Sequence, residues 1–265
     1  MKRRFKALVL AGSRRAERDP VARAAGVPHK ALAPVAGRPM IAHVLEALLD
    51  SGAFEALYLV LDDALRQELP AWDGFPARLP LTLESSRDSI AASVAQVFAR
   101  TGPPLFVTTA DHPLLTADIL REFLDRAERA GGDVTIGLVE AGRFAPLHEP
   151  GRRTWLRFAK RRFSGANLFL LRSSQAQKAL EFWRRVERER KRPWRLAAAF
   201  GPGLLFGYLL HRWTLEGAFA RMSRRLGVEL QPVVLSRAEA AIDVDRPEDL
   251  RLVERLLARR PGVAG

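Results

Sequence analysis

Short apolar runs alternate with amphipathic stretches through the first 150 residues. The apolar runs have the length of buried strands and lie at Ala7–Leu10, Leu57–Leu61, Leu79–Glu84, Leu105–Thr109 and Val134–Leu138. The stretches between them carry apolar residues at helical spacing and predict helices at Met40–Ser51, Ser89–Ala99 and Thr116–Ala130. This alternation predicts an α/β fold with a mostly parallel, doubly wound, Rossmann-like sheet and helices on both faces.

The second half of the chain is more basic and more aromatic. It predicts strands at Asn167–Leu171 and Glu229–Leu235 and helices at Ser174–Arg190, Thr214–Leu226 and Pro247–Ala258. Pro247 suits the first turn of the last helix, because the missing N–H of proline would have no partner there. We therefore expect a single domain over residues 1–265, with a basic and apolar helical insertion at 174–228.

Composition excludes several kinds of protein. The 265 residues include no cysteine, so disulfides, thiolate metal sites and a cysteine nucleophile are excluded. The longest apolar stretch, Leu196–Leu210, is interrupted by Gly-Pro-Gly and is shorter than the roughly 20 residues that span a bilayer. The apolar run near the N-terminus is too short for a secretory signal and is interpreted as the first strand. We expect a cytoplasmic protein, with a peripheral location on the inner membrane face as an alternative.

The net charge of +13 comes from one segment. Residues 151–225 hold 19 Lys or Arg against 4 Asp or Glu, whereas the remaining residues hold 24 against 26. Basic residues and tryptophans around 184–213 suit contact with an anionic membrane surface. A packed helical subdomain or a homodimer interface suits the same composition. Nucleic acid is the weakest alternative, since no recognised nucleic-acid-binding module accompanies the charge.

Polar residues that suit a phosphate site follow the first predicted strand. Ala11, Gly12, Ser13, Arg14 and Arg15 come directly after it, and Lys30 lies in an otherwise apolar, proline-flanked stretch. Glycine lets a backbone approach a ligand, and cationic side chains bind phosphate oxygens. An ordinary surface loop and a solvated lysine are the alternatives.

Aspartates that suit a metal site follow two further strands. Asp111 comes directly after Leu105–Thr109, and Asp243 and Asp245 alternate on an extended segment, where alternate residues share a face. Carboxylates in such places can hold Mg²⁺ against phosphates. The alternatives are that Asp245 caps the last helix and that His112 has a structural role.

Taken together, these motifs resemble the MobA-like NTP transferases, nucleotidyltransferases with a GT-A-type fold. The pieces that carry the resemblance are ALVLAGSRR, HKALAPVAGRPMIAHVL, SRDSIAASV, TTADHPLLT, FSGANLFLLR and AIDVDRPEDL. They cover most of the chain outside roughly 175–228. Two departures are Ser13, where the family usually has a second glycine, and the fifteen residues from Arg15 to His29 before the lysine.

The resemblance implies a role for each matching residue. The nucleotide would contact Leu10, Ala11, Gly12, Ser13, Arg14, Arg87 and Ser89. Lys30 and Arg15 would neutralise the leaving pyrophosphate, with Asp111 as the third catalytic residue. Asp111 and Asp245, joined by Asp243, would bind Mg²⁺ or Mn²⁺, and Asn167 and His112 would contact the acceptor.

The implied activity is a Mg²⁺-dependent nucleotidyltransferase. It would transfer an NMP from an NTP to a phosphorylated small molecule or lipid headgroup and release pyrophosphate. The alternatives are a GT-A-type glycosyltransferase that uses a nucleotide-sugar, and a non-catalytic nucleotide-binding module that docks on a membrane. The residues do not distinguish the base, the acceptor or the oligomeric state.

Overall fold

A twisted sheet runs through the middle of the protein. The computed structural model describes residues 4–12, 19–68, 79–147, 154–189, 201, 207–208, 210 and 212–259. The main sheet consists of β1 (Phe5–Leu10), β4 (Phe54–Leu61), β5 (Leu81–Ser85), β6 (Leu105–Thr109), β7 (Val134–Glu140), β8 (Leu156–Phe158), β9 (Arg161–Leu171) and β10 (Leu230–Leu235). A separate two-stranded sheet is formed by β2 (Pro34–Val35) and β3 (Arg38–Pro39).

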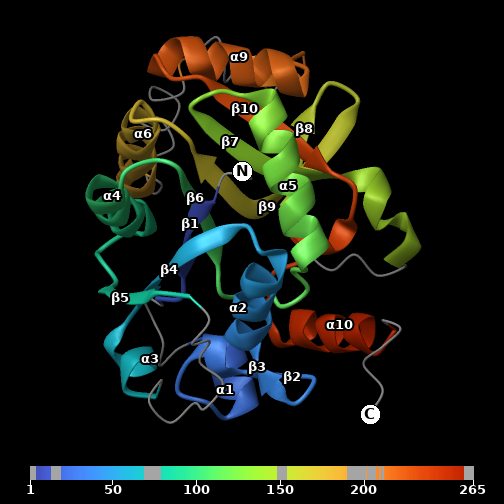
Figure 1. Ribbon diagram of the computed structural model, residues 1–265. Helices are drawn as coiled ribbons and strands as arrows, with labels where there is room; N and C mark the ends of the chain where they lie inside the picture. The colour runs from blue at the N-terminus through green and yellow to red at the C-terminus, as the bar shows by residue number, and fades with distance from the viewer. Residues whose placement is uncertain are drawn as a thin grey trace.

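The strand order shows that the sheet is doubly wound. The order is β10–β7–β9–β6–β1–β4–β5, with β8 paired to β9 (Figure 1). Strand β1 pairs in parallel with both β4 and β6, and β5 continues the parallel set beyond β4. The chain therefore leaves β1 toward β5 on one side and returns on the other side through β6. The order reverses between β1 and β6, and a ligand is expected beyond the carboxyl ends of these two strands.

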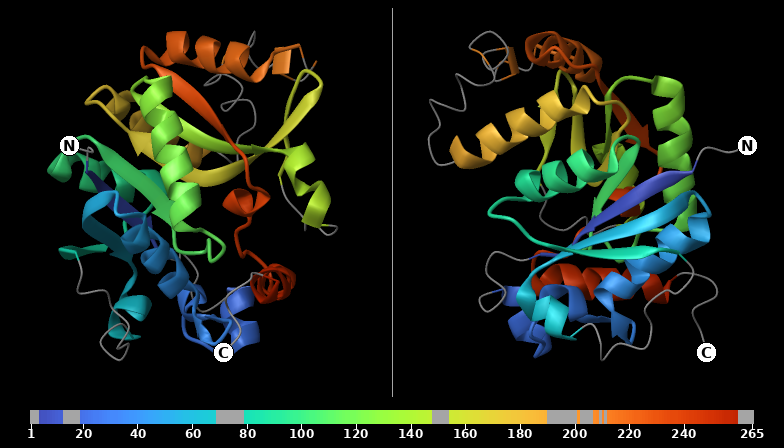
Figure 2. Two further views of the ribbon diagram at one scale, coloured as in Figure 1. Left: turned by 45° about the vertical axis from the view of Figure 1, so that its right-hand side comes forward. Right: turned by 60° about the vertical axis from the view of Figure 1, so that its left-hand side comes forward.

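Helices cover both faces of the sheet. The helices are α1 (Pro20–Ala25), α2 (Met40–Ser51), α3 (Asp63–Glu68), α4 (Ile90–Thr101), α5 (Ala117–Ala130), α6 (Ala176–Glu189), α9 (Leu215–Leu226) and α10 (Pro247–Ala258). Short 3-10 helices are η2 (Lys30–Leu32), η4 (Ala141–Leu147) and η5 (Ala238–Ala241). Helices α2 and α5 pack on one face and α4 and α6 on the other (Figure 2). Helices α1 and α10 lie together with the β2–β3 hairpin below the sheet in Figure 1.

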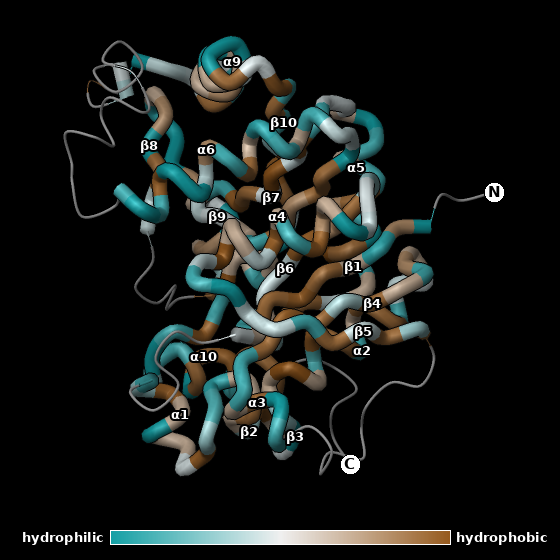
Figure 3. Tube along the Cα trace, turned by 90° about the vertical axis from the view of Figure 1, so that its left-hand side faces the viewer, coloured by the Kyte–Doolittle hydropathy of each residue, from teal (hydrophilic) through white to brown (hydrophobic). Residues whose placement is uncertain are grey.

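Local signals in the sequence account for these elements. The central strands β1 and β6 are strongly apolar, whereas the helices mix apolar and polar positions (Figure 3). This is the pattern of strands buried on both faces and helices buried on one. The hydroxyl of Thr116 caps α5 by accepting from the Ile119 amide at 3.3 Å, as predicted. Pro247 occupies the first turn of α10, also as predicted.

The predicted fold class is confirmed, with local differences. Strand β9 begins at Arg161 rather than at Asn167 and runs antiparallel between β6 and β7. Part of the expected Arg15–His29 loop is a helix, α1, which is capped by Asp19 and closed by Gly26 in the left-handed conformation. The pattern of apolar positions did not predict α3, β8 or the β2–β3 hairpin. Of the expected insertion at 174–228, the structure describes α6, α9 and a few residues between them.

An aromatic cluster holds the sheet to one helical layer. Phe106 of β6 is fully buried, and its ring centroid lies 5.2 Å from that of Phe54 and 5.8 Å from that of Phe123 on α5. These contacts join β4 and β6, which lie on either side of β1, to α5 in one core. Among the described residues, no helix is both long and apolar enough to span a bilayer.

We expect Phe106→Ala to destabilise the protein by about 3–5 kcal/mol, because it removes a buried aromatic ring and leaves a cavity. Urea unfolding followed by circular dichroism measures the change. Leu83→Ala is the control, since Leu83 is 38% exposed on β5, and it should cost no more than about 0.5 kcal/mol. Equal effects of the two substitutions would contradict this account of the core.

Candidate active site

The loops after β1 and β6 meet where the strand order reverses. Leu10 and Thr109, the last residues of these strands, are register partners. The Ala110 amide donates to the Leu10 carbonyl at 3.0 Å, and the Ala11 amide donates to the Val60 carbonyl at 2.7 Å. The hydrogen bonding of the sheet therefore continues one residue beyond the strands. It fixes the positions from which Gly12 and Asp111 leave the sheet.

Lys30 joins two of the predicted aspartates. Its Nζ donates to Asp111 Oδ2 at 2.7 Å and to Asp245 Oδ1 at 3.2 Å. The Lys30 and Asp111 side chains are 18% and 19% exposed, whereas Asp245 is 68% exposed. One ammonium thus connects the loop after β6, the segment before α10 and the short helix η2. Asp245 does not cap the last helix, which was the alternative role that the sequence allowed, because the N-cap residue of α10 is Arg246.

The charges of this cluster shift each other's proton affinities. Burial by itself would lower the pKa of the Lys30 ammonium, but Asp111 and then Asp245 outweigh it, so this pKa lies above its ordinary value. Burial would raise the pKa of the Asp111 carboxyl, but the Lys30 ammonium outweighs it, so this pKa lies below its ordinary value. Both groups are charged at neutral pH.

Asn167 and Asp243 form a second contact beside this cluster. Asn167 Nδ2 donates to Asp243 Oδ2 at 3.3 Å. The Val244 amide donates to the Asp111 carbonyl at 2.9 Å, which ties the segment of Asp243 and Asp245 to the loop after β6. Asn167 has a φ of 50°, a left-handed conformation that asparagine tolerates better than most residues. The structure therefore brings Asp243, Asp245 and Asn167 to the same edge as Asp111.

Gly12 permits a close approach between two loops. A Cβ atom at this position would lie 2.8 Å from Ser86 Cβ, closer than real contacts allow. Gly12 therefore lies directly against the loop after β5, which carries Arg87 and Ser89. Arg87 is exposed, and its side chain is hydrogen-bonded to Gln96 of α4. The Ser89 hydroxyl caps α4 by accepting from the Ala92 amide at 3.1 Å.

The structure does not place His112 or the predicted loop residues 13–15 among the side chains of this cluster. His112 is fully buried, which favours the structural role that the sequence left open for it. Ser13, Arg14 and Arg15 lie outside the described residues, so their roles remain predictions.

His29 and Asp62 were not predicted, yet they help to fix Lys30. His29 is 2% exposed, and its Nδ1 accepts from the Ala31 amide at 3.0 Å at the start of η2. Its Nε2 lies 3.3 Å from Asp62 Oδ2. Burial lowers the pKa of His29, so the ring is neutral and carries its proton on Nε2, facing Asp62. Only the position of His29 beside Lys30 offered a signal in the sequence.

The donor groups of the cluster fit a divalent cation that is only partly held by protein. Asp111 Oδ1 is buried and accepts no hydrogen bond of normal geometry from the described residues. Within the described part of the chain, no three carboxylate or histidine groups form a complete metal cage. Mg²⁺ is commonly held by one or two carboxylates, with water and substrate phosphates as its other ligands. Asp111 with Asp245 matches that requirement.

A doubly wound sheet binds its ligand at the switch point, and the lysine and carboxylates found there suit a ligand with phosphate groups. The MobA-like NTP transferase domain matches residues 7–193, about 70% of the chain. The chain therefore belongs to this family, as the sequence motifs predicted.

One relative known by its sequence and two solved structures illustrate the similarity. A 3-deoxy-manno-octulosonate cytidylyltransferase of Methylococcus capsulatus is 35% identical over 127 residues, which cover 47% of this chain and 46% of that protein. The chain thus matches less than half of that relative. A hypothetical transferase from Thermus thermophilus is 35% identical with a TM-score of 0.76, over 93% of this chain and 99% of that one. The CMP:2-keto-3-deoxy-manno-octonic acid synthetase in complex with CTP shares the fold, with 16% identity, a TM-score of 0.57 and coverage of 98% and 99%.

We expect Gly12→Ala to destabilise the protein by about 1–3 kcal/mol, because the added methyl group overpacks the contact with Ser86. Adding Ser86→Gly should restore much of the loss, since it removes the clashing Cβ atom. Urea unfolding of the single and double variants measures both effects. Gly142→Ala is the control, as no atom lies within 4 Å of the place that its methyl group would take. The absence of any rescue would show that Ser86 is not the obstacle.

We expect Asp111→Asn to lower the free energy of unfolding at pH 7 by about 2 kcal/mol, the value of a charge-assisted hydrogen bond. Because the pKa of Asp111 is lowered by folding, its contribution is present above about 3.8, the ordinary value, and is lost as the pH falls further. The difference between wild type and variant should therefore shrink below pH 4. Unfolding at pH 7, 5 and 3.5 tests this.

Asp118→Asn is the matched control for this experiment. Asp118 is 68% exposed in an ion pair with Arg121, so its loss should cost less than about 1 kcal/mol. If the effect of Asp111→Asn were the same at pH 3.5 as at pH 7, the ion pair would not be its cause.

Proposed function

We propose that the protein transfers a nucleotidyl group from an NTP to a phosphorylated acceptor and releases pyrophosphate. The observation that carries the proposal is the contact of Lys30 with Asp111 and Asp245 at the β1–β6 switch point, in a member of the MobA-like NTP transferase family. This combination favours transfer from an NTP over transfer from a nucleotide-sugar. The lysine supplies a fixed positive charge for the phosphates of a triphosphate.

The reaction requires positioning and charge stabilisation rather than a covalent nucleophile from the protein. An acceptor phosphate oxygen attacks the α-phosphorus, the bond between the α-phosphorus and the bridging oxygen breaks, and pyrophosphate leaves with that oxygen. The Lys30 ammonium donates to the phosphates in place of its present carboxylate partners. It thereby stabilises negative charge on the leaving group. Arg15 would add a second positive charge, and Asn167 would orient the acceptor.

Asp111 and Asp245 would hold Mg²⁺ or Mn²⁺. When bound, the ion would neutralise charge on the triphosphate. The lowered pKa of Asp111 keeps this carboxylate ionised and available as a ligand at neutral pH. Asp243 would act from the same segment, where its contact with Asn167 connects the metal side of the site to the acceptor side.

We further propose CTP as the preferred substrate. The curated relative at 35% identity is a cytidylyltransferase, and the solved synthetase of similar fold was in complex with CTP. Arg87 and Ser89 are suited to contact the base and ribose, because the close approach of Gly12 to Ser86 places their loop beside the nucleotide edge. The exposed guanidinium of Arg87 can reorient toward a ligand, whereas the Ser89 hydroxyl would have to leave its helix cap.

Pyrophosphate release from each of the four NTPs, with Mg²⁺ and a panel of phosphorylated acceptors, tests the proposal. We expect release with CTP, and its loss when EDTA is added. Lys30→Met should lower kcat by about 10²–10³-fold, the usual effect of removing one group that stabilises developing charge. Asp111→Asn should raise the Mg²⁺ concentration that gives half-maximal activity.

Lys178→Met is the control for Lys30→Met, because Lys178 is an exposed lysine on α6. Its activity should equal that of the wild type. Release of a nucleoside diphosphate from a nucleotide-sugar, without pyrophosphate release from any NTP, would replace the proposal with the glycosyltransferase alternative. Full activity of Asp111→Asn at low Mg²⁺ would remove Asp111 from the metal site.

A further inference from the structure

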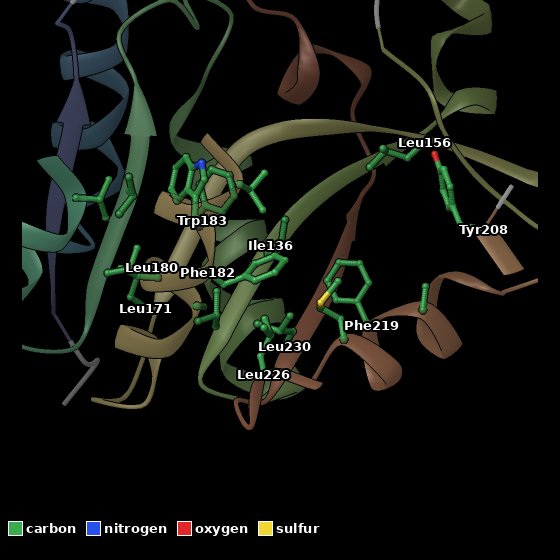
Figure 4. A pocket seen from close by; sticks show the side chains of 18 of the residues that line it. Ile136, Leu156, Leu171, Leu180, Phe182, Trp183, Tyr208, Phe219, Leu226 and Leu230 are labelled. Atoms are coloured by element: carbon green, nitrogen blue, oxygen red, sulfur yellow. The ribbon is translucent and has the colours of Figure 1, made fainter. Parts of the chain in front are cut away.

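A large apolar cavity lies on the sheet face opposite α2 and α5. Its volume is about 540 Å³, within the range of pockets that bind small molecules. Strands β7 and β9 form its floor, and helices α6 and α9 form its walls (Figure 4). The cavity plays no part in the nucleotide site described above, which lies beyond the carboxyl ends of β1 and β6.

The cavity is elongated along β9. At one end it is lined by Leu171 of β9 and Leu180 of α6, and at the other by Leu156 of β8 and by Tyr208 (Figure 4). Leu156 pairs with Phe163, eight residues before Leu171 on β9. At the rise of a strand this separation is roughly 26 Å. The volume spread over that length gives a mean cross-section of about 20 Å², which suits an extended hydrocarbon chain better than a base or a sugar.

The lining supports the same class of ligand. Every described lining residue is aliphatic, aromatic or methionine, and none carries a charge or an amide. A nucleotide or sugar inside it would lose its hydrogen bonds to water without replacement, which is costly. A hydrocarbon chain makes no hydrogen bonds to water, so it loses none on entering the cavity. Trp183 packs against Phe169 with ring centroids 5.8 Å apart and the ring planes tilted by 33°, so the aromatic part of the lining forms a packed wall.

Cationic side chains lie beside the lining at the β8 end. The segment 154–163, which forms β8 and the start of β9, holds four basic residues and no acidic one. Leu156 and Phe158 of β8 line the cavity, so the side chain of Arg157 between them leaves the strand on the opposite face. On α9, the Arg221 guanidinium lies 3.5 Å from the ring centroid of the lining residue Trp213. An anionic headgroup is therefore the natural complement of this end.

We propose that this cavity binds the hydrocarbon chain of a monomeric, single-chain amphiphile, with its anionic headgroup at the β8–β9 hairpin. The chain lies along β9 between α6 and α9, and Arg221 contacts the headgroup. The site is independent of the proposed nucleotidyl transfer. Burial of each methylene group should strengthen binding about fourfold.

Isothermal titration of the delipidated full-length protein with alkyl phosphates below their micelle-forming concentrations tests this site. We expect saturable binding of one dodecyl phosphate per chain. Octyl phosphate should bind up to about 200-fold more weakly, since four fewer methylene groups are buried. Arg221→Gln should weaken dodecyl phosphate severalfold and leave dodecanol unaffected. Native mass spectrometry of the same mixtures checks the stoichiometry.

Substitutions that fill the cavity give a second, independent test. Ala179→Trp on α6 places an indole in the cavity and should weaken dodecyl phosphate at least tenfold. Ala218→Trp on α9 provides the same test from the opposite wall. Glu181→Trp, at an exposed position on α6, is the matched control and should bind as the wild type does. Circular dichroism and thermal unfolding confirm that each variant is folded.

Three results would overturn the proposal. The first is no saturable binding by the wild type, which would mean that the chain's own residues occupy the space. The second is affinity that does not depend on chain length or on either filling substitution. The third is equal binding of wild type and Ala179→Trp to anionic vesicles without uptake of any monomeric chain, which would make the basic surface a membrane contact instead.

Discussion

The site depends on the contact of one partly buried lysine with two aspartates from distant parts of the chain. Lys30 lies 81 residues before Asp111 and 215 residues before Asp245. Three features hold the ammonium in place: the short helix η2, the neutral His29 that caps this helix, and the two carboxylates. A partly buried charge is costly unless it is paired, so these segments must be assembled together for the cluster to form. The charges that would bind phosphates and metal thus also hold the edge of the sheet together.

This arrangement would let the proposed substrate site accept a triphosphate with little rearrangement of charge. The cluster holds its charges in pairs, and a triphosphate with its metal ion can replace these internal partners by similar ones. The cation that now meets carboxylates would meet phosphate oxygens, and the carboxylates would meet the metal ion. Such an exchange requires little reorganisation of charge, which is the condition under which electrostatic stabilisation is most effective.

Strand β9 connects the edge of the sheet that holds Lys30 and Asp111 to the apolar cavity. It runs antiparallel between its neighbours β6 and β7, from the edge that holds the Lys30 cluster toward the opposite end of the sheet. Asn167 meets Asp243 at the edge, while Phe169, two residues further on, lines the apolar cavity. The face under α2 and α5 is a continuous packed core. The opposite face holds the cavity beneath α6 and α9, in the basic half of the chain.

The sequence by itself determined the elements with strong local periodicity and the residue types of the site. Helices α2 and α10 have the predicted bounds, because a helical stripe, a cap and a proline act within a few residues. Asp111 was predicted as a site residue because it directly follows a buried strand. Tertiary structure alone decided the direction of β9, the pairing of Lys30 with both aspartates, and the His29–Asp62 contact. It also decided the shape of the cavity. Each of these depends on segments far apart in the chain, whose meeting no local pattern of apolar and polar residues records.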